Sequence, residues 1–153
     1  RRHRKSDLQE WRVCHIAYMY EVFLYSSPAH LPLSFACHTW FVTNENGIFT
    51  RYEILFQKNI QTKKHLHISH IEVFNGLGIF PGIKKPVWKW NIIGCLSGPQ
   101  AKRIIEEIKA SETKYPHTST YRLIGPNSNT YTQWILDKFP EWDIQLPWNA
   151  FGK

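Results

Sequence analysis

The feature that most restricts the fold is an Asn-Gly pair between two stretches that have the composition of β-strands. Asn46-Gly47 follows a strand-like segment at 38–43 and precedes another at 48–57. Asn and Gly adopt positive φ angles at little cost, which a two-residue hairpin turn requires. We therefore expect the two segments to be neighbouring antiparallel strands of one sheet.

Further strands and a first helix follow from local patterns. Alternating apolar residues, or clusters of β-branched and aromatic residues, predict three more strands, at 19–25, 66–74 and 87–95. A helix is predicted over 99–111, with Ser97 as its cap. The apolar face of that helix consists of Ala101, Ile104, Ile105 and Ile108.

A second helix is predicted from Asn127 to Phe139, after a short strand-like start at 121–124 and a Gly-Pro turn. Asn127 is a favourable N-cap, and Pro140 stops the helix. These elements indicate an α+β domain, an antiparallel sheet of about five strands with two or three helices. We assign it to residues 18–153, after a basic N-terminal segment at 1–17 whose part 6–17 favours neither helix nor strand.

The composition limits the class of protein. With 153 residues, 42% of them hydrophobic, the chain can bury the core of a single domain. No run approaches the ~18 apolar residues of a membrane-spanning helix. The chain starts with Arg rather than Met, which leaves an upstream signal or anchor open. Its three cysteines are far apart and predict neither a disulfide framework nor a zinc site, and we expect no cofactor.

The start of the second helix is the first candidate site. Ser128 shares a helix face with three residues that follow it at helical spacing, Tyr131, Thr132 and Ile135. It therefore lies in the first turn and faces the protein body. Free backbone N–H groups and the helix dipole there stabilise negative charge, which suits a nucleophile or an anion contact. The alternative is that Asn127 and Ser128 only cap a core helix.

The order of strand, turn, Asn-Ser-Asn-x-Tyr and amphipathic helix resembles the nucleophile segment of circularly permuted papain-like hydrolases. That group includes NlpC-type, PPPDE-type and lecithin-retinol-acyltransferase-like proteins, in which an Asn-Cys-x-x-Phe element carries the thiol and a strand-borne His comes earlier. The resemblance implies that Ser128 stands at the Cys position. It also implies binding roles for the neighbouring Asn127, Asn129 and Tyr131.

A closer resemblance is to an uncharacterised bacterial family with three motifs. Its H-x-W-F-V motif matches His38–Val42, its Y-R-x-x-G-P-N-S-N-T motif matches Tyr121–Thr130, and its L-P-x-x-A-x-G-K motif matches Leu146–Lys153. This resemblance spans residues from about 18 to the end. It implies a fold, a candidate site that includes Trp40, a bacterial origin and Ser as the ordinary residue at position 128. It implies no substrate and does not decide the compartment, for which a cytoplasmic and a membrane-associated location are both open.

The implied chemistry is acyl hydrolysis or transfer at an amide or ester, as in a serine-dependent amidase or esterase. His38 would take a proton from Ser128, with Asn44 or Glu53 orienting the imidazole and backbone N–H groups stabilising the oxyanion. A serine hydroxyl is far less acidic than a thiol, so it needs a well-placed base. The site is therefore a working serine hydrolase or an inactive site retained for binding. His38 alone is equally typical of a hydrogen-bonded strand histidine.

Three other patterns have weaker support. His65, His67 and His70 form a histidine-rich patch, but no carboxylate or Cys completes a metal site. The segment 84–90 interleaves Lys with Trp88 and Trp90, which suits single-stranded nucleic acid but is more typical of a sheet core. Cys37 adjoins His38, and neighbours on a strand point to opposite faces, so the two are a poor catalytic pair.

Three functions remain open. The first is the Ser–His acyl hydrolase or transferase, acting on a small-molecule, peptide or lipid-like substrate. The second is a catalytically inactive papain-like domain that binds a peptide, lipid or glycan. The third is a basic module for nucleic acid, which we disfavour, or for an anionic membrane surface reached through Arg1–Lys5.

Overall fold

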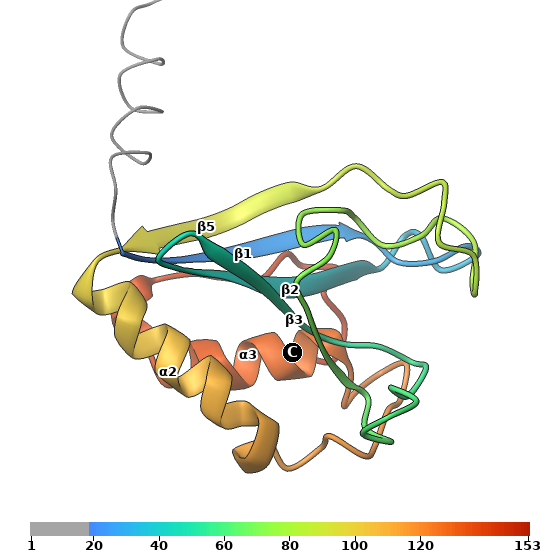
Figure 1. Ribbon diagram of the computed structural model, residues 1–153. Helices are drawn as coiled ribbons and strands as arrows, with labels where there is room; N and C mark the ends of the chain where they lie inside the picture. Colours follow the sequence, from blue (N-terminus) through green and yellow to red (C-terminus); the bar gives the residue numbers. More distant parts are fainter. Residues whose placement is uncertain (1–18) are drawn as a thin grey trace, which may run out of the picture.

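The computed structural model describes residues 19–153, and the predicted basic segment 1–17 lies outside the described residues. The elements, in chain order, are β1 (Tyr20–Pro28), β2 (Cys37–Glu45), β3 (Ile48–Ile54), β4 (Leu66–Ser69), β5 (Asn91–Ser97), α2 (Pro99–Lys114), α3 (Ser128–Leu136) and a 3₁₀ turn (Pro140–Trp142). The five strands form one antiparallel sheet in the order β4-β3-β2-β1-β5, and both helices lie below it in Figure 1. The predicted α+β class, with a five-stranded antiparallel sheet and two helices, is confirmed.

The hairpin forms where the Asn-Gly pair predicts it. Glu45 pairs with Ile48, and both turn residues have positive φ angles, 54° at Asn46 and 88° at Gly47. The side-chain oxygen of Asn44 accepts a hydrogen bond from the Gly47 N–H at 2.8 Å. The turn therefore fixes the register of β2 and β3.

Helix α2 packs against the sheet through the predicted apolar face, and Ala101, Ile104, Ile105 and Ile108 are all buried. The predicted cap was wrong. Ser97 is the last residue of β5, Gly98 occupies the N-cap position, and no side chain caps the helix. Pro99 at the helix start accounts for this, because Pro has no N–H to satisfy and its φ angle is already helical.

Helix α3 has the predicted N-cap. Asn127 accepts hydrogen bonds from the backbone N–H groups of Asn129 and Thr130, and the Thr130 hydroxyl accepts one from the Asn127 N–H. The helix ends at Leu136, earlier than predicted. Residues 138 and 139 continue it with bonds to the third residue back, as in a 3₁₀ turn. Pro140 disfavours the α conformation in the residue before it, which explains the change.

The sheet carries an apolar layer on each face. The helix face holds the larger core, formed by α2, α3 and the strands. The opposite face, which we call the outer face, holds a smaller core of Tyr25, Trp40, Val42 and Val73. Segment 70–90 crosses this outer face, and the Trp40 indole donates a hydrogen bond to the Val73 carbonyl at 3.1 Å.

The strand predictions for 70–74 and 87–90 were therefore wrong. β4 stops at Ser69 and β5 starts at Asn91. A run of aromatic and β-branched residues can pair as a strand within a sheet or pack over its face. Here it packs over the outer face. The strand-like start at 121–124 is also a turn, with Leu123 and Ile124 exposed.

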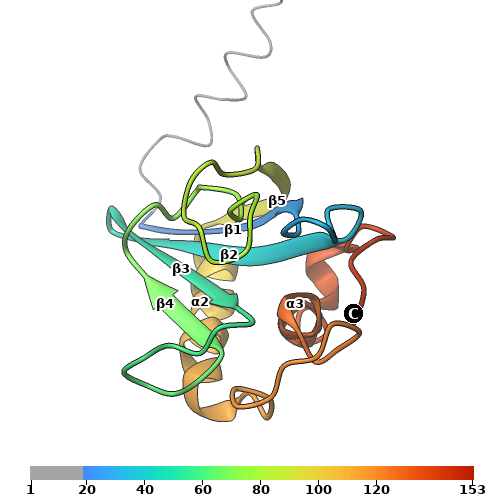
Figure 2. The same ribbon diagram turned by 90° about the vertical axis from the view of Figure 1, so that its right-hand side faces the viewer.

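One end of the sheet collects loops around the start of α3 (Figure 2). We call it the loop end, and it consists of residues 29–36, 55–65, 115–127 and 146–153. Hydrogen bonds link each of these segments to another. His65 N–H donates to the Thr118 carbonyl, Asn127 to the Phe151 carbonyl, and Asn149 to the Phe35 carbonyl. Within residues 19–153, no helix is long and apolar enough to cross a membrane.

Candidate functional site

Ser128 is the first residue of α3 and only 4% exposed. Its hydroxyl has no hydrogen-bond partner among residues 19–153. The Asn127 side chain already takes the N–H groups of Asn129 and Thr130, at 2.9 and 3.2 Å. Two of the amides that a helix start could offer to an oxyanion are therefore occupied by the cap.

The side-chain amides of Asn127 and Asn129, on either side of Ser128, join distant parts of the chain. Asn127 Nδ2 donates to the carbonyls of Leu123 at 2.9 Å and Phe151 at 3.0 Å. Asn129 Nδ2 donates to the Cys37 carbonyl at 2.8 Å and to Phe151 at 3.0 Å. These bonds fasten the C-terminal segment and the first residue of β2 to the helix start. Asn127 and Asn129, expected to bind a ligand, therefore have structural partners.

A second group of polar side chains lies on the outer face. His38 Nε2 and Glu53 Oε2 are 2.8 Å apart, and Arg51 donates to the same oxygen at 2.7 Å. All three side chains are buried. Arg51 also donates to the carbonyls of Val73 and Asn75, so this cluster fastens segment 70–90 onto the sheet.

Trp40 forms the floor of this cluster. The His38 ring stacks on it with centroids 5.7 Å apart, and the Arg51 guanidinium carbon lies 4.2 Å from its ring centroid. Tyr25 stacks on the same indole at 5.6 Å. The indole is fully buried, so Trp40, which the sequence assigned to ligand binding, packs in the outer core.

The charges in the cluster shift its pKa values. Burial lowers the pKa of His38, with Arg51 and His30 acting in the same direction against the attraction of Glu53. Burial alone would raise the pKa of Glu53, but the Arg51 charge and the hydrogen bonds to His38 and Arg51 hold it at about 2. At neutral pH the pair is therefore a neutral imidazole beside a carboxylate. Nε2 must carry the proton to donate to Glu53, which leaves Nδ1 as the basic nitrogen.

The structure places Ser128 and His38 on opposite faces of the sheet. Thr39 is on the helix face, where its hydroxyl lies 2.9 Å from Asn129 Oδ1 and 2.7 Å from the Thr132 hydroxyl. His38 precedes Thr39 in β2 and therefore points to the outer face, as Trp40 does. Strand β2 does run beside the start of α3, but it directs Thr39 and not His38 toward the helix.

The other candidates separate in the same way. Glu53 is brought to His38, whereas Asn44 lies at the far end of β2, roughly 20 Å along the strand. There it donates to Glu21 at 2.7 Å and supports the hairpin turn. Tyr131 is buried in the helix-side core, with its hydroxyl 2.8 Å from that of Ser111. Neither Asn44 nor Tyr131 faces a site with His38.

The histidine-rich patch is dispersed. His65, His67 and His70 each have a ring nitrogen within 3.1 Å of a backbone carbonyl, those of Leu55, Gln57 and Phe49 respectively. In the described range 19–153, no three His, Cys, Asp or Glu side chains gather as a metal site.

The Lys-Trp segment is not a strand with one Trp face. The Trp88 indole donates to the Ala29 carbonyl at 3.0 Å, and Trp90 packs edge-on against Tyr25 at 5.2 Å. Both indoles therefore help to hold segment 70–90 on the outer face.

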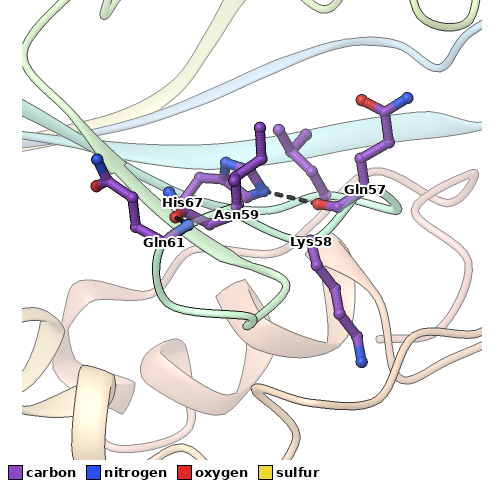
Figure 3. Close-up of a pocket in the computed structure, with 7 residues that line it drawn as sticks. Gln57, Lys58, Asn59, Gln61 and His67 are labelled. Carbon is purple, nitrogen blue, oxygen red and sulfur yellow. Dashed lines mark hydrogen bonds between the residues drawn. The ribbon is translucent and has the colours of Figure 1, made fainter.

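An open pocket of about 480 Å³ lies at the β3–β4 loop. Its lining consists of Leu55, Gln57, Lys58, Asn59, Ile60, Gln61 and His67. Figure 3 shows Gln57 and Lys58 pointing in opposite directions and His67 bonded to the Gln57 carbonyl. Neither Ser128 nor His38 lines this pocket, so it is not the cleft that the Ser–His prediction requires.

Arg51 is the polar residue of the cluster that sequence reasoning missed. A signal was present, because Arg51 and Glu53 alternate in a predicted strand and therefore share a face. Two opposite charges on one face of a central strand favour a buried ion pair.

Comparisons with known proteins add one result. A family model described as a protein of unknown function (DUF3750) matches residues 19–153. No curated protein and no solved structure matches the chain. The expected family without an assigned function is thereby confirmed, while the papain-like likeness and the bacterial origin stay predictions.

Proposed function

The chain belongs to the DUF3750 family of proteins of unknown function, and we propose that it is a binding domain whose loop end takes an anionic amphiphile. Such a ligand has an anionic head group joined to an apolar part. Among the peptide, lipid and glycan ligands considered above, it is the lipid-like one. The binding is without turnover at Ser128.

The composition of the loop end carries this proposal. Its four segments contain five cationic side chains, Lys58, Lys63, Lys64, Arg122 and Lys153, and no Asp or Glu. They also expose eight large apolar side chains, Leu31, Phe35, Phe56, Ile60, Leu123, Ile124, Trp148 and Phe151. Many exposed apolar side chains at one end of a domain are typical of an interaction site, and the absence of acidic side chains there favours an anionic partner.

The helix start supports binding rather than catalysis. Ser128 has no base or carboxylate bonded to it among residues 19–153, and its neighbours Asn127 and Asn129 are engaged with backbone carbonyls. The permuted papain-like arrangement remains part of the proposal. Its support is the contact between the first residue of β2 and the start of α3, through the Cys37 carbonyl and Asn129.

The test compares detergent micelles that share a tail and differ in head-group charge. We expect the full chain to bind lysophosphatidylglycerol micelles and not lysophosphatidylcholine micelles. Added salt should weaken the binding, because exposed charges are screened. Ser128→Ala should bind as the parent does. Equal binding to the two micelles, or none to either, would refute the proposal.

A second candidate function is favoured by the His38–Glu53 geometry. Glu53 accepts the hydrogen bond of Nε2 and so fixes the tautomer in which Nδ1 is unprotonated, as a general base requires. Nδ1 would take a proton from water as the water oxygen bonds to an ester carbonyl carbon. The ester C–O bond then breaks, and His38 returns the proton to the leaving alkoxide.

This activity would depend on His38 and not on Ser128. A panel of p-nitrophenyl esters tests it. Turnover that is lost in His38→Gln and retained in Ser128→Ala would support a His38 hydrolase. Turnover retained in His38→Gln would exclude one, and loss in both variants would return Ser128 to the centre.

A further inference from the structure

Of the eight exposed apolar side chains of the loop end, only that of Ile60 lines the open pocket at the β3–β4 loop, and the other seven lie outside it. Ile124 is 84% exposed and Trp148 82%, and both lie in turns next to the start of α3. Phe35, Phe56 and Leu123 are also more than half exposed. A soluble amphiphile with one tail needs a concave pocket to cover that tail, whereas a bilayer receives side chains that project into it.

We propose that the loop end docks on an anionic lipid bilayer, with Phe35, Ile124 and Trp148 entering the head-group region. The inference rests on the proposed binding function and names the occupant of the same surface.

The projecting rings are held on a fixed platform. Phe151 contacts Phe35 on one side and Trp148 on the other, with ring centroids 6.3 and 6.4 Å apart. Asn149 lies between Trp148 and Phe151 in the sequence. Its side chain donates to the Phe35 carbonyl at 3.0 Å, and its backbone carbonyl accepts from the Cys37 N–H at 3.0 Å. A pre-ordered platform loses little conformational entropy when it inserts. Trp also favours the membrane–water interface, because its ring is apolar and its indole N–H is polar. Phe suits the apolar surface that inserts there.

The cations lie among the apolar tips. Arg122 immediately precedes Leu123, and Lys58 lies between Phe56 and Ile60; both cationic side chains are exposed. Because the four segments contain no Asp or Glu, no acidic side chain within them opposes the attraction to anionic lipid. Nucleic acid would satisfy the cations but would leave the aliphatic tips, Leu123 and Ile124, without a role.

The experiment is co-sedimentation of the full chain with two kinds of vesicle, phosphatidylglycerol mixed into phosphatidylcholine and phosphatidylcholine alone. We expect binding to the first only. Trp148→Ala and Ile124→Ala should each weaken it by roughly three- to tenfold, because each removes inserted apolar area. Arg122→Glu should weaken it as well, through charge repulsion.

Two control variants are matched to these changes. Ile48 is exposed like Ile124 but lies at the hairpin turn, at the other end of the sheet, so Ile48→Ala should bind as the parent does. Lys102 is an exposed cation on α2, and Lys102→Glu changes the net charge by the same amount as Arg122→Glu. It should weaken binding less than Arg122→Glu does if the charge at the loop end matters. A third variant replaces Arg1, Arg2, Arg4 and Lys5 by Gln. If it abolishes binding while the loop variants do not, the basic N-terminal segment is the contact and the inference is wrong.

The outcomes separate the two proposals. Binding to lysophosphatidylglycerol micelles without binding to vesicles would overturn bilayer docking and leave the amphiphile-binding function standing. Failure with both would refute both proposals. Tighter binding to single-stranded DNA than to anionic vesicles, or self-association that Trp148→Ala abolishes, would likewise overturn the bilayer as occupant.

Discussion

The three residues Asn127, Ser128 and Asn129 have different physical roles although they are adjacent. Asn127 caps α3 and holds the C-terminal segment through Phe151. Asn129 joins α3 to β2 through the Cys37 carbonyl and Thr39. Of these three side chains, only that of Ser128 makes no hydrogen bond within residues 19–153. The motif therefore specifies how the helix start joins the tail and the sheet.

Removing these side chains one at a time should separate the roles. We expect Asn129→Ala to lower the free energy of unfolding by about 3 kcal/mol, because it leaves the buried Cys37 carbonyl and Thr39 hydroxyl with fewer partners. Ser128→Ala should change it by less than about 1 kcal/mol. Urea unfolding followed by fluorescence measures both. An equal loss in the two variants would contradict this assignment.

The buried imidazole gives the fold a dependence on pH. Burial lowers the pKa of His38, so as the pH falls below its ordinary value of 6.5 the unfolded chain takes up a proton that the folded chain does not. Stability is therefore full above pH 6.5 and falls on acidification, by at most about 1.4 kcal/mol per pH unit for one group. The Glu53 contribution is present above about pH 4.5 and is lost as the pH falls toward 2.

The comparison of parent and His38→Gln at pH 7 and pH 5 tests this coupling. The parent should lose more unfolding free energy between the two pH values than the variant does. The amide of Gln can still donate to Glu53, so the variant retains one of the native contacts. Identical losses in the two proteins would mean that His38 takes up its proton equally in the folded and unfolded chains.

At the scale of elements, the C-terminal segment packs against the α3 cap through a glycine. A Cβ at Gly152 would lie 2.7 Å from the Asn127 side-chain nitrogen, and the backbone there has a φ angle of +93°. Strain at a positive φ angle alone costs about 1–3 kcal/mol. Gly152→Ala should therefore lower the free energy of unfolding by more than that amount. Gly47→Ala is the matched control, because Gly47 has a φ angle of +88° and nothing within 4 Å of its Cβ. Equal falls in melting temperature would show that the Asn127 contact contributes nothing.

The elements predicted correctly are those that local chemistry decides. The Asn46-Gly47 turn, the Asn127 cap and the apolar face of α2 depend on residues close in sequence, and each forms as expected. The segment 70–74 failed because its aromatic and β-branched residues suit a cover over the sheet as well as a strand within it. The cap at Ser97 failed because Pro99 made a side-chain cap unnecessary.

The site was harder to predict because both faces of β2 are buried. Its residues from Cys37 to Asn44 are all buried, so the usual alternation of apolar and polar residues does not tell which face meets the helix. A shift of one residue exchanges His38 and Thr39 between the faces. Glu53 could be proposed as the His38 partner from the sequence. The separation of His38 from Ser128 could not, because it depends on which face of β2 meets the helices, and tertiary packing decides that.

At the scale of the whole molecule, charge is distributed unevenly over the described residues. The carboxylates lie on α2, after α3, at the hairpin end, in segment 70–90 and buried at Glu53, while the four segments of the loop end have none. A molecule polarised in this way approaches an anionic surface with its basic end first. Docking through the loop end therefore predicts a single orientation, with the α3 start toward the lipid and the Asn46-Gly47 turn away from it.

Hydrogen exchange with and without anionic vesicles measures that orientation. Backbone amides in 29–36, 115–127 and 146–153 should exchange more slowly on vesicles, because insertion removes them from water and restrains local opening. Amides of α2 and of the Asn46-Gly47 turn should exchange at the same rate in both conditions. Phosphatidylcholine vesicles serve as the control and should slow no segment. Slower exchange spread over the hairpin and α2 as well would indicate binding without orientation, and the loop end would then have no special role.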